Sequence, residues 1–410
     1  MIARVKSLNL YGSIFAVYIG AGPIYWIPWI EIRFVEAIKL SLYLLVVIWP
    51  LLYKVKLSRF YFPGGRGVFW LMLAYLALSI PGMLQGEIAD SLYRLQNTIQ
   101  IITLVFVCGF LIKNGMIESV THRAVKIFAF FSILSLGLML LIPDYISPLN
   151  DELTLIQTGL GGSRTGWSPA IALYLPWLYS GLVFSGFWVW LCSLSMIANQ
   201  VLVAGRTGMI AALIPYMIFG FTRKSYKMTF AAVGILAIIF LFVINNLQLL
   251  RLDEGGFGSR QALSVLSTGR TDQHLFAFES IIKSPITGSG FGQVKFGEDL
   301  IHNVILRFAA EGGVPYALSI ICLLSIALYR GWRGVLAKDK FVTSAFLTVL
   351  SGVVASLFEP VEMFGSFYSA GIWWLCFAIC VGYKRPSVKV KEFISTKFHS
   401  DSGLRESDGV

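Results

Sequence analysis

Residues 187–222 read FWVWLCSLSMIANQVLVAGRTGMIAALIPYMIFGFT, and Arg206 is the one charged residue in this stretch. A single helix of that length would be about 54 Å long at about 1.5 Å per residue. The hydrocarbon core of a bilayer is only about 30 Å thick. Gly205 and Gly208 lie on either side of Arg206 and can break the helix. The stretch therefore predicts two short membrane spans that fold back, with Arg206 near an apex at or below the outer membrane surface.

The composition extends this prediction to the whole chain. Of its 410 residues, 56% are hydrophobic and 13% are charged, and the mean hydropathy is +0.73. Soluble domains are about 25% charged, so lipid must be the solvent for most of this chain. We expect an all-α, polytopic bundle of about twelve transmembrane helices, forming one domain over 1–383, followed by a polar, disordered tail at 384–410. The predicted spans are 8–30, 34–53, 67–85, 97–113, 124–143, 169–185, 187–204, 207–222, 228–247, 301–329, 341–358 and 363–383.

The basic residues orient these spans. With the N-terminus in the cytoplasm, the cytoplasmic segments hold 22 of the 33 Lys and Arg residues but 6 of the 22 Asp and Glu residues. Both termini are therefore predicted to be cytoplasmic. The two long connections, 144–168 and 248–300, then lie outside, and the second is the large loop between spans nine and ten. The net charge is +11, but the basic residues form short clusters between apolar runs, so nucleic acid is not an expected partner.

Two outer arginines stand beside glycines at expected helix starts. Arg206 opens the eighth span, and Arg270 ends the sequence Ser267-Thr268-Gly269-Arg270. A helix is predicted from about Thr271 to Lys283, with its apolar residues on one face: Leu275, Phe278 and Ile282. Free N–H groups and the helix dipole favour an anion near such an N-terminus. The alternatives are a snorkelling arginine at a helix end and a solvated loop arginine.

His302 and Asn303 lie at the outer mouth of the tenth span. Histidine is suited to proton transfer near neutral pH, whereas a capping or packing role is the alternative. Glu311 is expected farther along the same helix, on the face opposite His302. It follows Arg307 by four residues, so an intrahelical ion pair is the simplest explanation for both.

A fourth polar segment, 161–167, precedes the sixth span and contains Arg164 between glycines. Glycines allow a ligand close to the backbone, but they also form ordinary loops. Three outer arginines and one histidine together suggest a site at the outer membrane surface. Arginine suits phosphate because its guanidinium donates two parallel hydrogen bonds. The acidic pairs of the outer loops lack the spacing of metal ligands, so no metal is expected.

At these residues the chain resembles the O-antigen ligase and Wzy-type polysaccharide polymerase superfamily. The resemblance covers most of the chain, including the number of spans and the large outer loop. Family members often carry tryptophan shortly after the second Gly-Arg pair, where this chain has His274; we expect His274 to be structural. The matching motifs are Gly205-Arg206-Thr207, Thr268-Gly269-Arg270, the KSPITGSGFG segment at 283–292, and His302-Asn303 with Leu306, Glu311 and Gly312.

The resemblance implies a membrane glycosyltransferase of the GT-C type, facing the periplasm from a bacterial inner membrane. Its donor would be a glycan on undecaprenyl pyrophosphate, with no cofactor and with a chain-length regulator as a candidate partner. Arg206 and Arg270 would bind the pyrophosphate, with Arg164 as a weaker candidate. His302 would be the general base on the acceptor hydroxyl, and the anomeric centre would invert. Asn303 and Glu311 would support the site.

Three functions remain open at the level of sequence. A polymerase joins repeat units on the lipid carrier, and a ligase transfers the finished glycan to lipid A-core. The segment 162–167 is more similar to exopolysaccharide polymerases, which favours the first. A flippase or other transporter is the third, but transporters usually carry internal repeats and ionisable residues near the bilayer midplane. This chain shows no obvious repeat, and its candidate residues lie near the outer surface.

Overall fold

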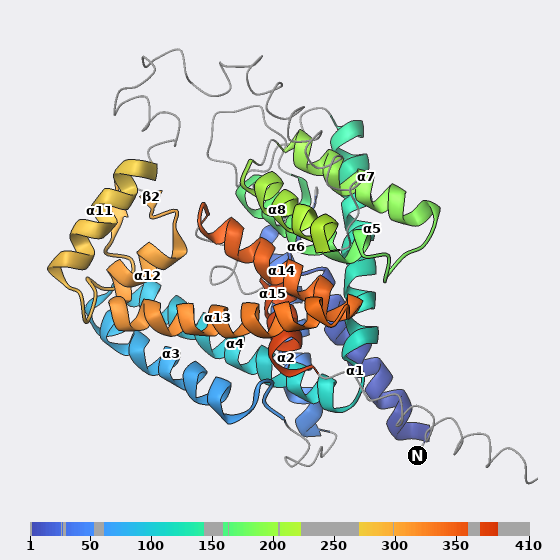
Figure 1. Ribbon diagram of the computed structural model, residues 1–410, viewed down its shortest axis with the longest axis horizontal. Helices are drawn as coiled ribbons and strands as arrows, with labels where there is room; N and C mark the ends of the chain where they lie inside the picture. The colour runs from blue at the N-terminus through green and yellow to red at the C-terminus, as the bar shows by residue number, and fades with distance from the viewer. Residues whose placement is uncertain are drawn as a thin grey trace, which may run out of the picture.

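The computed structural model describes residues 2–25, 27, 30–52, 61–142, 159–162, 164–203, 206–222, 270–297, 299–359 and 370–383. This part of the chain is helical apart from connections and one two-stranded antiparallel hairpin (Figure 1). The predicted ninth span, 228–247, residues 144–158 and 248–269 of the two outer loops, and the tail 384–410 lie outside the described residues. The elements are α1 (Ile2–Gly20), α2 (Ile32–Leu52), α3 (Gly65–Gln85), α4 (Ile88–Lys113), α5 (Ile117–Leu141), the short turn η2 (Gly159–Gly161), α6 (Arg164–Tyr179), α7 (Phe187–Leu202), α8 (Arg206–Thr222), α11 (Arg270–Lys283), β1 (Lys295–Phe296), β2 (Asp299–Leu300), α12 (Val304–Gly312), α13 (Val314–Leu336), α14 (Lys340–Ser356) and α15 (Gly371–Gly382).

Several of these helices suit a lipid environment. The helices α3, α4, α5 and α13 are long and apolar enough to cross a membrane. Shorter apolar helices are found in α1, α7, α8, α14 and α15. The described part of the chain is therefore an all-helical fold compatible with a membrane-embedded protein.

The predicted break within residues 187–222 is confirmed. Helix α7 ends at Leu202 and α8 begins at Arg206. Helix α8 packs closely against α6 just after this break. Any side chain at Gly208 would collide with Ser168 of α6. The first turns of α6 and α8 are thereby held side by side.

The predicted tenth span, 301–329, is wrong as a single helix. Residues 301–303 precede the helix, α12 ends at Gly312, and α13 begins at Val314. Gly313 has φ 89°, a backbone conformation that favours glycine. A side chain there would also collide with the carbonyl oxygen of Ile286. Pro315 lies in the first turn of α13, where its missing N–H is tolerated. The chain therefore turns at Gly313, and only α13 is long enough to span.

Other predicted boundaries differ more modestly. The first span was expected at 8–30, but α1 ends at Gly20, before Pro23. The fourth was expected at 97–113, but α4 already begins at Ile88. The extension contains Arg94, which is buried with its guanidinium over the rings of Phe291 and Phe308. These contacts with aromatic rings favour burial of a cation inside an apolar bundle.

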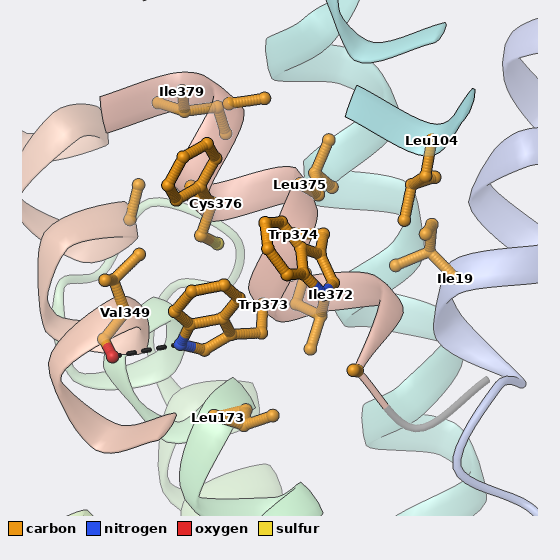
Figure 2. Packing of buried hydrophobic residues seen from close by; sticks show 14 of the residues in the cluster. Ile19, Leu104, Leu173, Val349, Ile372, Trp373, Trp374, Leu375, Cys376 and Ile379 are labelled. Atoms are coloured by element: carbon orange, nitrogen blue, oxygen red, sulfur yellow. Dashed lines mark hydrogen bonds between the residues drawn. The ribbon is translucent and has the colours of Figure 1, made fainter. Parts of the chain in front are cut away.

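The interior of the bundle is formed around α14, which packs against α6, α8, α13 and α15. Residues 371–381 of α15 are all buried. Figure 2 shows Trp373 of α15 between α14 and α6, where its indole N–H donates a 3.0 Å hydrogen bond to the carbonyl oxygen of Val349. Enclosure on several sides fixes α14, and with it the segment that follows its C-terminal end.

Helices α11 and α12 lie beyond the end of the layer formed by α3, α4 and α13 (Figure 1). The connection between α11 and α12 is attached to that layer through its backbone. The N–H of Phe291 donates to the carbonyl oxygen of Gly82 at 3.1 Å, and the N–H of Glu87 donates to that of Phe291 at 3.0 Å. The N–H of Val314 donates to the carbonyl oxygen of Pro285 at 2.8 Å. These backbone hydrogen bonds fix the connection after α11 relative to α3, α4 and α13, although Gly82 and Phe291 are far apart in the sequence.

Candidate functional site

One buried carboxylate joins three of the segments that carry the candidate motifs. Glu359, directly after α14, is 3% exposed. Its Oε1 accepts hydrogen bonds from Arg270 Nη2 at 2.9 Å and from the Thr207 hydroxyl at 3.2 Å. Its Oε2 lies 3.2 Å from His302 Nδ1. The structure therefore brings Arg270 and His302 together around Glu359, an acidic residue outside the motifs considered above.

The contact with Glu359 determines what the His302 ring can do. A carboxylate accepts hydrogen bonds, so the neutral tautomer that satisfies it carries its proton on Nδ1. The lone pair is then on Nε2, for which no hydrogen-bond partner occurs among the described residues. The imidazole is 27% exposed, so this nitrogen can accept a proton from a bound molecule. The contact with Glu359 also fixes the orientation of the ring.

Arg270 keeps part of its hydrogen-bonding capacity. It is the first residue of α11, and its side chain is 23% exposed. Nη2 is engaged by Glu359, whereas Nε is buried and has no hydrogen-bond partner in the described structure. A buried donor without a partner is costly. An anionic ligand placed against this edge would satisfy it and would face a helix N-terminus as well.

Two further helices begin with arginine close to this group. Arg206 is the first residue of α8 and precedes Thr207, which bonds to Glu359. Arg164 is the first residue of α6, whose first turn packs against α8 at Ser168 and Gly208. The N-termini of α6, α8 and α11 thus gather around one place, and each contributes partial positive charge. The arrangement is suited to an anion that carries more than one negative charge.

Two neighbours position His302. The side-chain oxygen of Gln273, a buried residue of α11, accepts from the His302 backbone N–H at 3.4 Å. Asn303 is the N-cap of α12, and its side-chain oxygen accepts from the N–H groups of Ile305 and Leu306, both at 3.1 Å. The capping alternative raised for this segment is therefore met by Asn303, and it leaves the His302 ring directed toward Glu359.

Replacing Asn303 by alanine is expected to cost about 1 kcal/mol of stability, because two backbone donors lose their acceptor. Any activity that depends on the His302–Glu359 contact should also fall, since the first turn of α12 positions His302. The matched control is Asp339→Ala, which removes the equivalent cap of α14. Thermal unfolding should shift similarly in both variants, whereas activity should fall in Asn303→Ala alone. Equal activity losses would mean that Asn303 acts only through global stability.

Glu311 belongs to a different group. Its Oε1 accepts from Arg307 Nε at 3.0 Å, which confirms the predicted i, i+4 ion pair. The same oxygen lies 3.4 Å from the backbone nitrogen of Gly292. Glu311 is fully buried, whereas His302 is paired with Glu359. Glu311 can therefore support the site only indirectly, by attaching α12 to the connection that follows α11.

His274 is close enough to the site to interact with its charges. It lies one turn after Arg270 on α11, and its buried Nε2 has no hydrogen-bond partner among the described residues. Burial lowers the pKa of His274 from its ordinary 6.5, and the positive charge of Arg270, joined by that of His302 when its ring is protonated, lowers it further. The ring is therefore neutral at pH 7.

This shift predicts a contribution to stability that disappears in acid. A histidine whose folded-state pKa is lowered binds fewer protons when folded than when unfolded, so stability falls as the pH drops below about 6.5 toward the lowered pKa. We expect His274→Gln to flatten that part of the dependence. The check is the thermal unfolding midpoint of both proteins at pH 7.5 and 5.5. An unchanged pH dependence in His274→Gln would contradict the assignment.

Glu359 could have been found from the sequence. It ends the apolar run 341–358, directly before Pro360, and the predicted topology places that end on the same side as Arg206, Arg270 and His302. The signal for Glu359 is an acidic residue at the outer mouth of a span, on the same side as three arginines that the fold does not require. No protein-family model, no curated protein and no solved structure matches this chain.

Proposed function

We propose that the protein is a membrane glycosyltransferase that polymerises oligosaccharide repeat units carried on undecaprenyl pyrophosphate. The observation that carries the proposal is the His302–Glu359 pair beside Arg270 and the N-terminus of α8. It combines a positioned base with a concentration of positive charge. The motif resemblance described above supplies the class of donor and acceptor, and the apolar helices support a membrane location.

The proposed chemistry needs a base and charge stabilisation. The acceptor hydroxyl attacks C1 of the donor sugar, and the bond between C1 and the phosphate oxygen breaks. The hydroxyl proton passes to His302 Nε2, and the electron pair of the broken bond stays on the departing pyrophosphate. Arg270 and Arg206 stabilise that charge, and Arg164 is a weaker candidate for the same role. Attack from the side opposite the leaving group inverts the anomeric centre.

The proposed setting is the periplasmic face of a bacterial inner membrane, with both termini in the cytoplasm and twelve spans. The excess of basic residues in the inner segments supports this orientation. A pyrophosphate on a polyprenyl chain is fixed at the membrane surface, which is where the predicted topology places the arginines. Such a donor is already activated, so positioning and electrostatics supply most of the required rate enhancement.

Arg270→Lys is expected to raise the KM for the lipid-linked donor by about 10-fold, since lysine retains the charge but cannot present two parallel donors. Arg206→Lys should change KM in the same direction. The matched control is Lys283→Arg at the other end of α11, which should leave KM unchanged. Initial rates over a range of donor concentrations provide the measurement. A wild-type KM in Arg270→Lys would remove this residue from the pyrophosphate site.

The function is tested with the purified protein, repeat units on undecaprenyl pyrophosphate and a chelator, with no other acceptor. A ladder of products on a gel is the expected result. Product that forms only after lipid A-core is added would instead identify a ligase. Absence of both products, with glycan translocation that His302→Ala does not affect, would overturn the proposal in favour of a transporter.

A further inference from the structure

The outer face of α11 is apolar and uncovered by the rest of the described structure. Leu275, Phe278 and Ile282 are 42%, 51% and 78% exposed, and Ile286, just after the helix, is 73% exposed. The opposite face is packed: Gln273 and Ala277 are buried against a small cluster that includes residues of α12. A helix with one packed face and one bare apolar face needs a second apolar environment.

The bare face continues an apolar surface at the ends of two neighbouring helices. Leu84 at the end of α3 and Ile88 at the start of α4 are 82% and 80% exposed. The segment that follows α11 is bonded to this α3–α4 turn through Gly82, Glu87 and Phe291. Helices α3 and α4 are long and apolar enough to span a membrane, so exposed leucine and isoleucine at their ends face lipid. Ile286 and Ile282 extend that lipid-facing surface onto α11.

The direction and charges of α11 fit the same environment. The axis of α11 is steeply inclined to that of α13 in Figure 1. Glu279 and Lys283, both exposed, line one edge of the apolar stripe. A helix that lies in the membrane plane with an apolar stripe and charged edges is typical of the interface between acyl chains and headgroups.

We propose that α11 is an interfacial helix whose apolar stripe, formed by Leu275, Phe278, Ile282 and Ile286, is inserted into the outer lipid leaflet. Inserted in this way, α11 holds its first residue, Arg270, at the depth of the lipid phosphates. The consequence for pyrophosphate binding rests on the function proposed above, whereas the insertion itself does not.

The test is a depth measurement on the full chain in nanodiscs without donor, so its outcome is independent of activity. Cys322, the exposed cysteine among the described residues, is first replaced by serine. A spin label is then attached at Ile282→Cys or Phe278→Cys. The references are Phe130→Cys, on the exposed face of the spanning helix α5, and Ala337→Cys, in the exposed turn between α13 and α14.

We expect labels at 278 and 282 to collide with dissolved oxygen several-fold more often, relative to an aqueous nickel complex, than the label at 337, and to resemble the label at 130. Collision ratios that match the label at 337 would overturn the proposal, because the stripe would then face water. A third outcome is a contact between two copies of the chain. In that case the spectrum of the label at 282 would show dipolar broadening at high protein-to-lipid ratio. At low ratio the broadening would disappear and the label would collide as if in water, which would also overturn the proposal.

Discussion

A His302→Ala variant that inserts and folds normally is expected to lose transfer by at least about 10²- to 10⁴-fold, the usual contribution of a general base. In the proposed reaction His302 accepts the hydroxyl proton, and its ring is held 3.2 Å from the Glu359 carboxylate. Binding of the donor should change little, because Arg270 keeps its place at the start of α11. The loss should therefore appear in kcat, with the KM for the donor near that of the wild type.

The control for this variant is His122→Gln in α5, a part of the bundle away from Glu359 and its partners. It should retain wild-type kcat. Tryptophan fluorescence and gel filtration of the wild type, His302→Ala and His122→Gln check that each protein has folded. If a well-folded His302→Ala protein transferred sugar at the wild-type rate, the general-base role would be excluded, while the anion-binding role of the arginines would still stand.

Glu359→Gln should be nearly as damaging, with a loss of about 10²- to 10⁴-fold, although the substitution changes the side-chain volume very little. The glutamine amide is uncharged, so it no longer offers a negatively charged acceptor to Arg270 and His302. The His302 ring then loses the contact that keeps its proton on Nδ1, and a partly buried guanidinium loses its counter-charge. Both kcat and the KM for the donor are expected to deteriorate, which distinguishes this variant from His302→Ala.

Three companion variants separate the roles of Glu359. Glu359→Asp keeps the charge on a shorter side chain and should restore part of the activity. Thr207→Val removes one hydroxyl donor to the same carboxylate. It leaves the contacts with Arg270 and His302, so it should cost much less activity than Glu359→Gln. Glu279→Gln, on the exposed face of α11, should be silent. A Glu359→Gln protein with more than half of the wild-type rate would show that the carboxylate is a structural group only.

The fold illustrates what periodicity and charge can predict. Apolar runs and glycines predicted the break between α7 and α8, because a stretch too long for the bilayer must fold back. They could not predict the turn at Gly313, since α12 and α13 form one continuous apolar run in sequence. The turn arises from a tertiary contact: the carbonyl oxygen of Ile286 occupies the space that a side chain at 313 would need. Glycine followed closely by Pro315 was the available local signal.

The site shows the same division. Arg270 and His302 could be proposed because each is a polar residue where an apolar helix does not require one. Their association could not be read from spacing, because it depends on Glu359, which is far from both in the chain. Glu311 attracted attention for its position in an apolar helix, yet Arg307 accounts for it locally. A helix start that carries a cation can be recognised from sequence, and so can an acidic residue at the mouth of a span. The contacts that join them are found only in three dimensions.

The position of Glu359 in the chain also determines when its contacts can form during synthesis. Thr207, Arg270 and His302 leave the ribosome first, and the residue that joins them emerges only after α14 has been made. Until then, a guanidinium and an imidazole meant for a shared interior position lack their counter-charge, which opposes their burial. Chains that are still being synthesised, or that are truncated before residue 359, should therefore insert into the membrane but should not use lipid-linked sugars. If the protein is the proposed transferase, its activity is gained in one late step of biogenesis.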